Sequence, residues 1–333
     1  MSSSLKSAGE RVAPSIPATP PSPAPLPLRD GSVTLRDLVD LYMLHYAGRD
    51  GARAHRLAWW QAQLGPHPFT EISDDHIHAA LEGLAHREAR YYAGKDADGV
   101  PIYKGKGRPM LPATINRYHQ ALAAVLTWAI KRRIAPKGWM NPSRAVEKRS
   151  EAGSARTRFL SDAERERLLL ACKAAAWDKL YLLVLMALTT GARKGELQGL
   201  RWADIDLEAR LAHVGRSKNG DPKALPLVPA VSGELVRLKG APTTLVFGSK
   251  RVPGTPFEFI YQWHDALKAA GIRGFRFHDL RHSCASHLAA NGATLLEIAD
   301  VLGHRQLQMT KRYSHLTTAH KAGLIDRLMG TIR

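Results

Sequence analysis

Apolar residues recur at helical spacing through most of this chain, which restricts it to a fold built mainly from α-helices. The clearest helical stretch is 114–130, and its apolar stripe consists of Ile115, Tyr118, Leu122, Val125 and Ile130. The segment 207–228 looks strand-like instead, and its dipeptide Asn219-Gly220 favours a tight hairpin. The sequence therefore predicts a mainly α fold with a small β-sheet, the α+β class.

Residues that can cap a helix predict where further helices begin. Ser73 or Asp74 can cap a helix that runs to about residue 84. Ser161 and Glu164 have the spacing of a capping box, ahead of an amphipathic helix that includes Cys172. The stretch 181–190 is apolar on all sides, which predicts a buried helix.

A polar segment, 148–158, divides the helical pattern into two blocks and predicts a linker. The chain has 333 residues, enough for two separate cores, so we expect a helical domain over 30–147 and a second domain over 159–333. Residues 1–29 are rich in proline and predict a disordered tail. The glycine- and lysine-rich stretch 94–110 interrupts the first domain as a loop or short hairpin.

The formal net charge of +18 predicts a polyanionic partner. Residues 86–149 hold fourteen Lys and Arg against four Asp and Glu, a net charge of +10. This can be a solvated face or a surface that follows DNA phosphates, and we favour the second. An anionic membrane fits less well, because no apolar run approaches the roughly 20 residues needed to span one. The candidate DNA contacts are Arg117, Lys131, Arg132, Arg133, Lys104, Lys106 and Arg108.

Two cysteines, Cys172 and Cys284, exclude a disulfide framework and fit a reducing, cytoplasmic setting. The N-terminus lacks the apolar core of a signal peptide. No Cys, His or carboxylate group has metal-site spacing, so we expect no metal and no cofactor. A Cys/His protease built around Cys284 is an alternative, but it gives the neighbouring arginines no role.

Five residues form the most informative chemical pattern. Tyr313 follows His304 by nine residues, His278 and Arg281 lie upstream in one short segment, and Arg193 lies between two glycines. Each has an ordinary explanation alone, as a surface pair, a helix cap or a half-buried aromatic. Together, two arginines, two histidines and a late tyrosine predict a site that holds a phosphodiester and attacks it with a phenol.

Four segments carry a family resemblance, and they occur in the family's order and at family-like distances. They are TTGARKGELQGLRWADID (189–206), SKNGDPKALPL (217–227), HDLRHSCASHL (278–288) and LGHRQLQMTKRYSHL (302–316). Residues 158–333 resemble the catalytic domain of the tyrosine recombinase (phage integrase) family. The first domain is similar, less specifically, to that family's helical core-binding domain. The resemblance implies a SAM-like core-binding domain followed by a tyrosine-recombinase catalytic domain with a C-terminal tail helix.

The resemblance also implies a role for each residue. Tyr313 would attack the scissile phosphorus and form a 3′-phosphotyrosyl bond. Arg193 and Arg281 would hold the non-bridging oxygens, since a planar, permanently charged fork suits phosphate. His304 would donate a hydrogen bond to the same oxygens, and His278 would act as a general base near the phenol.

The proton donor to the leaving 5′ oxygen is implied to be a hairpin lysine. We prefer Lys218, because it lies at the Asn-Gly turn, and keep Lys223 as the alternative, because the hairpin register is open. Glu196 and Asp279 are interpreted as structural, pairing with arginine or orienting histidine. His282 is interpreted as a supporting group and not as a proton carrier.

The sequence thus predicts a metal-independent, site-specific recombinase that integrates or excises a mobile element. A Xer-type recombinase that resolves DNA dimers is the nearest alternative. A type IB topoisomerase and a catalytically silent DNA-binding protein are alternatives from other classes. Only about 30 proline-rich residues precede the helical domain, so we expect no separate arm-binding domain.

The partners expected from the resemblance are duplex DNA with specific recombination sites and further copies of the chain. We expect a homo-oligomer on DNA, most simply a tetramer, with accessory DNA-bending or directionality factors. The tail 319–329 would pack onto a neighbouring protomer or back onto its own domain. We expect the protein in a bacterial cytoplasm, associated with the nucleoid, and encoded by a bacterium or phage.

Overall fold

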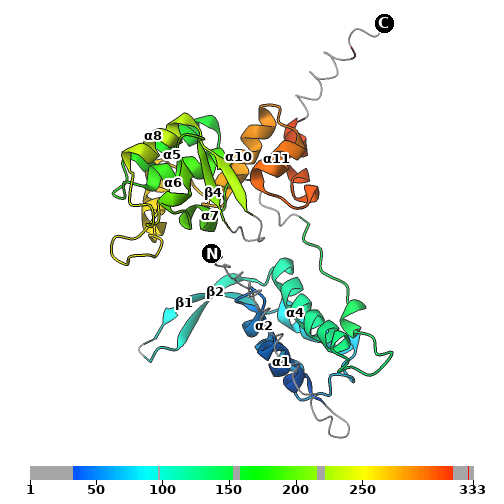
Figure 1. Cartoon of the computed structure of the whole chain (residues 1–333). Helices are drawn as coiled ribbons and strands as arrows, with labels where there is room; N and C mark the ends of the chain where they lie inside the picture. Colours follow the sequence, from blue (N-terminus) through cyan, green and yellow to red (C-terminus); the bar gives the residue numbers. More distant parts are fainter. Residues whose placement is uncertain (1–32, 97, 153–157, 216–221, 318–328, 330–333) are drawn as a thin grey trace, which may run out of the picture. The chain divides into compact units, whose positions relative to one another are not determined.

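The computed structural model describes residues 33–96, 98–152, 158–215, 222–317 and 329. The chain divides into two compact units, Met1–Ala155 and Arg156–Arg333. We describe each unit by itself (Figure 1). The sequence-based linker, 148–158, includes the position where one unit ends and the next begins.

The first unit is a small helical domain. Its helices are α1 (Leu35–Leu44), α2 (Arg53–Leu64), α3 (Asp74–Ala85), α4 (Pro112–Lys131) and the 3-10 turn η1 (Pro142–Arg144). Thr34 and Ser73 cap α1 and α3 through their hydroxyl groups, as the sequence predicts for Ser73. The core lies between α4 and the other helices, and its largest fully buried side chain is Trp60, whose indole donates to the Tyr118 carbonyl at 2.9 Å.

A long β-hairpin interrupts these helices. Strand β1 (Glu88–Lys95) pairs antiparallel with β2 (Pro101–Pro109), with register shifts on β1 between Glu88 and Arg90 and between Tyr92 and Gly94. The ribbon extends beyond the helices (Figure 1). The sequence predicted a loop or short hairpin over 94–110; the hairpin is confirmed, but it starts six residues earlier.

The second unit is helical around one small sheet. Its elements are α5 (Asp162–Lys173), α6 (Leu180–Thr190), α7 (Lys194–Gln198), η2 (Trp202–Asp204), β3 (Ile205–Asp206), β4 (Leu211–Val214), β5 (Lys223–Pro226), α8 (Pro229–Arg237), α9 (Ile260–Ala269), α10 (Asp279–Ala290), α11 (Leu295–Leu302), η3 (Leu307–Met309) and η4 (Lys311–Thr317). The strands form an antiparallel sheet in the order β3-β4-β5. The predicted α+β class is confirmed.

Helix α6 is the centre of the second unit. Its apolar side chains are buried on every side, as predicted, because α5, α8 and α10 all pack against it. The Ser161–Glu164 capping box at the start of α5 is also confirmed. A smaller apolar cluster joins α10 and α11 to Tyr313, so the predicted nucleophile is part of a packed interior.

Some predictions fall outside the described residues. These are the proline-rich tail 1–29, the hairpin turn with Lys218 and the proposed tail helix 319–329, apart from residue 329. Among the residues that the structure describes, no helix combines the length and the apolar character needed to cross a membrane.

Candidate active site

The start of helix α10 carries two of the predicted catalytic residues. His278 is the residue before the helix and is exposed, whereas Arg281 lies one turn further on and is only 5% exposed. The buried carboxylate of Asp279 accepts a hydrogen bond from the Arg276 backbone N–H at 2.8 Å and so fixes the entry into the helix. The sequence-based interpretation of Asp279 as a structural residue agrees with this contact.

Arg281 connects α10 to the end of α6. Its Nη1 donates to the Gly191 carbonyl at 2.7 Å, across 90 residues of sequence. Gly191 ends α6 in the left-handed conformation, φ 61°, and a Cβ there would lie 2.4 Å from Leu302 Cδ2. A glycine at this position therefore lets α6, α10 and α11 meet closely, and this meeting places the guanidinium.

Arg193 is held by its own short helix. It precedes α7, and its Nη1 donates to Glu196 Oε1 at 2.6 Å while its backbone N–H donates to Oε2 at 3.0 Å. The Glu196 side chain is 3% exposed and that of Arg193 is 21% exposed. The predicted pairing of Glu196 with an arginine is confirmed, and it pre-orients the Arg193 fork.

His304 follows the left-handed Gly303 that ends α11. Its Nδ1 lies 2.8 Å from the Thr310 hydroxyl, and Thr310 is fully buried. Burial, together with the nearby Arg281 and Arg193, lowers the pKa of His304 to about 4. The imidazole is therefore neutral at pH 7, and the contact with Thr310 fixes its orientation.

Tyr313 lies on η4, where its side chain is 6% exposed. Its hydroxyl is 2.6 Å from Nδ1 of His282, one turn of α10 beyond His278. Burial raises the pKa of the Tyr313 phenol, and the charges of Arg312 and Arg281 partly offset this. The phenol is thus protonated at neutral pH and needs a proton acceptor before it can attack.

Lys223, on β5, reaches the same place. Its Nζ is buried without a hydrogen-bond partner among the described residues, and a Cβ added to Gly303 would lie 3.7 Å from it. Burial lowers the pKa of Lys223 to about 8; the nearby Glu196 opposes this shift, while Arg281 and Arg193 add to it. A buried amine beside two guanidinium groups is placed to give up a proton.

The described residues therefore bring together Arg193, Arg281, His304 and Tyr313, with His278 at the exposed edge. The preferred lysine, Lys218, lies outside the described residues, so its contacts are not part of this geometry. The hydrogen bond between Tyr313 and His282 was not predicted from the sequence. The repeated histidine in His278-Asp-Leu-Arg-His282 was its only signal, because spacing along a helix does not show which ring a distant tyrosine reaches.

Cys284 lies beneath this site and is 3% exposed. Burial raises the pKa of its thiol to about 11, although Arg281 and Lys223 lower it somewhat. A thiol that stays protonated at pH 7 is a poor nucleophile, which weighs against the Cys/His protease alternative. Among the described residues, no group of His, Cys, Asp and Glu has the arrangement of a metal site.

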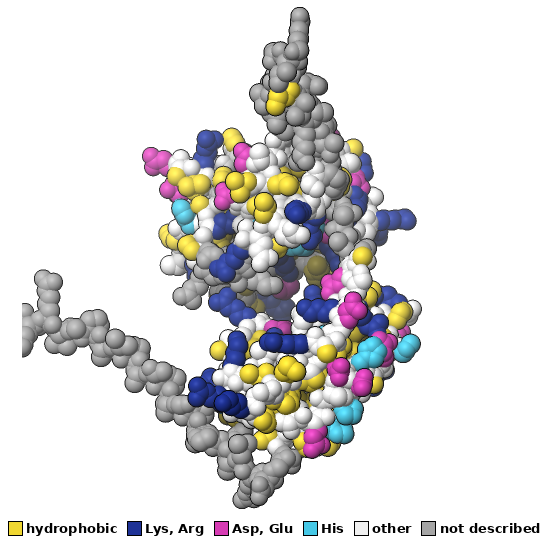
Figure 2. Space-filling view, turned by 90° about the vertical axis from the view of Figure 1, so that its right-hand side faces the viewer, with side chains coloured by type: hydrophobic (Ala, Val, Ile, Leu, Met, Phe, Trp, Pro, Cys, Tyr) yellow, Lys and Arg dark blue, Asp and Glu magenta, His cyan; other side chains and the backbone are white. Residues whose placement is uncertain are grey.

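The candidate DNA contacts all lie in the first unit and are all exposed. Arg117, Lys131, Arg132 and Arg133 belong to α4 or follow it, whereas Lys104, Lys106 and Arg108 lie on β2. Figure 2 shows Lys and Arg side chains gathered along one side of this unit, with Asp, Glu and His along another. A cavity of about 600 Å³ between the hairpin and the helices adds aromatic side chains, among them Trp59 and Tyr103.

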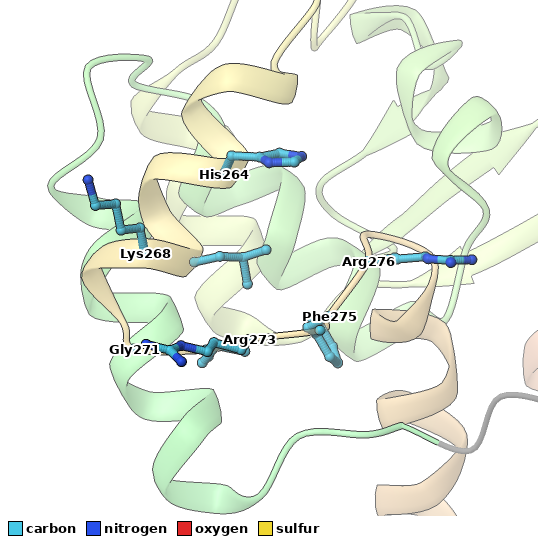
Figure 3. A pocket seen from close by; sticks show the side chains of 9 residues that line it. His264, Lys268, Gly271, Arg273, Phe275 and Arg276 are labelled. Carbon is cyan, nitrogen blue, oxygen red and sulfur yellow. The ribbon is translucent and has the colours of Figure 1, made fainter. Parts of the chain in front are cut away.

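The second unit contains another basic hollow, of about 580 Å³ (Figure 3). It is lined by His264 and Lys268 from α9 and by Arg273 and Arg276 from the loop that leads to α10. None of the predicted catalytic residues lines it. It is therefore separate from the site around Tyr313.

Comparisons with known proteins indicate the family of the chain. A model of the phage integrase family matches residues 158–320. The integrase of Salmonella phage P22 is 28% identical over 301 residues, which cover 83% of this chain and 75% of the phage protein. The type 1 fimbriae regulatory protein FimE of Escherichia coli (strain K12) is 33% identical over 181 residues, 51% of this chain and 91% of FimE.

Solved structures show the same fold. The Tn1549 transposon integrase in complex with transposon right end DNA has a TM-score of 0.66 at 19% identity, covering 89% of this chain and all of that one. A lambda integrase dimer bound to a COC′ core site has a TM-score of 0.60 at 22% identity, and the match covers 85% of this chain and 78% of that one. These structures show the fold, and the family model together with FimE shows that the chain belongs to the phage integrase family, as a tyrosine recombinase that transfers DNA strands.

Proposed function

We propose that this recombinase integrates or excises a mobile element by cleaving specific DNA sites with Tyr313. The observation that carries the proposal is the position of the buried Tyr313 phenol, which lies close enough to Arg281 to feel its charge, while Arg281 in turn lies close to Arg193. Arg193 and Arg281 hold the non-bridging oxygens of the scissile phosphate. His304, fixed by Thr310, donates a third hydrogen bond to them.

The attack forms a 3′-phosphotyrosyl bond and releases a 5′ hydroxyl. His278, at the exposed edge of the site, is the proton acceptor that the family resemblance suggests for the phenol. The leaving oxygen takes its proton from a lysine of the β4–β5 hairpin. Lys218 fits the family motif, and the buried, unpartnered amine of Lys223 supports a second candidate. Because the phosphodiester energy stays in the phosphotyrosyl bond, the strand can be rejoined without a nucleotide cofactor.

The first unit positions the DNA as the core-binding domain. Its exposed cations on α4 and β2 contact phosphates, which gives affinity but little sequence information. Assembly on DNA is part of the proposal, and among the similar structures is a lambda integrase tetramer bound to a Holliday junction. Integration of a mobile element is supported by the similarity to the phage P22 integrase over most of this chain. Accessory DNA-bending factors and action at the bacterial nucleoid also remain part of the proposal.

The test is covalent capture on DNA. The protein is mixed with a library of nicked duplexes with random arms, and adducts that resist denaturant are recovered, sequenced and digested for mass spectrometry. We expect the linked nucleotide on Tyr313, and we expect the recovered arms to define a preferred site. Tyr313→Phe should bind the recovered DNA and form no adduct.

Tyr261→Phe is the matched control, because that tyrosine lies in the same unit but on α9, where it is 79% exposed. It should form the adduct at the normal rate. An adduct on any residue other than Tyr313 contradicts the proposal. Efficient relaxation of a supercoiled plasmid that lacks the recovered site indicates a type IB topoisomerase instead.

A further inference from the structure

The partner of the nucleophile is the most informative contact in the site. Tyr313 Oη lies 2.6 Å from His282 Nδ1, and the two rings are tilted by 47° with centroids 6.1 Å apart. His278 is also close, but its ring meets His282 edge-on, at 5.3 Å between centroids and 88° between planes. The described contacts therefore join the phenol to His282 and His282 to His278.

His282 has the protonation state that an acceptor requires. Burial, His278 and Arg312 lower its pKa to about 4, and Arg281 adds to this while Asp279 opposes it. At pH 7 the ring is neutral, so Nδ1 can accept from the phenol when Nε2 carries the hydrogen. A bound phosphodiester brings negative charge close to Arg281, which offsets the cations around His282 and makes the ring more basic.

We infer that His282 is the catalytic base that takes the proton of Tyr313 during strand cleavage. In this step, an electron pair of Tyr313 Oη forms the bond to phosphorus while the phenol proton moves to Nδ1 of His282. The bond from phosphorus to the 5′ oxygen breaks, and that oxygen takes its electron pair and a proton from a hairpin lysine. In rejoining, the His282 imidazolium returns its proton to the departing phenolate.

The inference rests on the proposed function and assigns to His282 the role that the family resemblance suggests for His278. His278 lies at the exposed edge of the site, and its pKa is lowered by the burial of part of its ring and by Arg281. It faces the His282 ring and can influence its basicity. The direct contact with the phenol belongs to His282.

The experiment measures single-turnover adduct formation on the nicked duplex recovered by covalent capture. The two variants, His282→Asn and His278→Asn, each replace an imidazole by a smaller polar group that cannot take up a proton near neutral pH. Each is prepared with the natural Tyr313 and with 3,5-difluorotyrosine at that position, whose phenol is more acidic. Loss of a general base costs about 10²- to 10⁴-fold in rate.

We expect His282→Asn to lose activity in that range and the fluorinated tyrosine to restore most of it, because an acidic phenol needs little help to ionise. A residue that only positions Tyr313 would show no such rescue. His278→Asn should not be rescued. DNA binding and the thermal unfolding of the variants establish that each protein is folded.

Three results overturn the inference: an undiminished rate for His282→Asn, a lost rate that the fluorinated tyrosine does not restore, or rescue confined to His278→Asn. The last of these makes His278 the base. If the unmodified protein itself forms no adduct on Tyr313, the proposed function fails, and that outcome is distinct from failure of the variants.

Discussion

The two units of this chain hold their cations in opposite ways. In the first unit, Lys131, Arg132 and Arg133 are exposed at the end of α4. In the second unit, Arg281 is 5% exposed and bonded to a backbone carbonyl, and Arg193 is paired with a buried carboxylate. Charge that is held in place out of water can act on a transition state, whereas mobile surface charge mainly attracts a polyanion.

This difference predicts that a conservative change will be severe in one unit and mild in the other. Arg281→Lys keeps the charge but loses the planar fork and its bond to Gly191. We expect cleavage to fall by about 10²- to 10³-fold, as when one donor to a transition-state oxyanion is removed. The measurement is the single-turnover adduct rate on the captured DNA.

Arg276→Lys is the matched control, since Arg276 is exposed five residues earlier in the chain and its recorded contact uses the backbone. Its rate should stay near that of the unmodified protein. Full activity of Arg281→Lys would mean that charge alone is sufficient, and the contrast between the two units would then lose its chemical basis.

The ion pair of Arg193 and Glu196 tests the same contrast through stability. Arg193→Ala leaves a carboxylate with 3% exposure unpaired, and breaking a buried pair in this way costs about 3–5 kcal/mol. Because the Arg193 side chain is itself 21% exposed, we expect the lower end, about 3 kcal/mol. Denaturant unfolding gives the value.

The double variant Arg193→Ala/Glu196→Gln should recover most of the stability, since the carboxylate that lost its guanidinium partner is gone as well, but none of the cleavage. The unfolding and cleavage measurements thereby separate the contribution of Arg193 to stability from its contribution to catalysis. If Arg193→Ala unfolds at the same denaturant concentration as the unmodified protein, the Glu196 carboxylate is not effectively buried.

Lys223 extends the comparison to pH. Its pKa is lowered to about 8, so the folded protein binds this proton more weakly than the unfolded chain, and folding stability rises between about pH 8 and the usual lysine value of 10.5. Lys223→Met should therefore stabilise the protein at pH 7 by about 1–3 kcal/mol, discounted for partial solvent contact. The gain should be complete below pH 8 and disappear toward pH 10.5.

The exposed Lys131 provides the control, because Lys131→Met should change stability little at either pH. Thermal unfolding of both variants between pH 7 and 10 measures the effect. If the stability difference between Lys223→Met and the unmodified protein stays constant across this range, folding does not lower the pKa of the Lys223 amine.

The sequence predicted the framework of the site better than its contacts. Capping residues such as Ser161 and the apolar pattern of α6 specify local structure, so both helices were predicted correctly. The pairing of Glu196 with an arginine was also predictable, because the two residues are three apart at a helix start. These features depend on neighbours in the chain.

The contact between Tyr313 and His282 depends instead on how α10 packs against η4, across 31 residues. The spacing of residues along the chain does not specify which of two histidines, one helical turn apart, contacts the Tyr313 hydroxyl. The burial of Lys223 has the same origin, because its surroundings come from α7, α10 and the end of α11. Residue types alone therefore predicted which groups belong to the candidate site, whereas the contacts between those groups depend on the tertiary packing.

The smallest expected effect belongs to the exposed surface, and it distinguishes the units most directly. Each phosphate contact on duplex DNA contributes about −0.9 to the slope of log affinity against log salt. Arg132→Gln and Arg133→Gln should each lower affinity and make this slope shallower by about 1, measured by titration at several salt concentrations.

Once DNA is saturating, these variants should form the Tyr313 adduct at the normal rate, because their side chains act before the chemistry begins. Arg36→Gln is a useful control, since Arg36 is exposed on α1, outside the basic segment 86–149. If Arg36→Gln changes the slope as much as Arg133→Gln, the whole unit acts as a diffuse positive charge. If only the residues at the end of α4 change the slope, a localised group of surface cations contacts the phosphates. Exposed and buried cations then differ in function residue by residue.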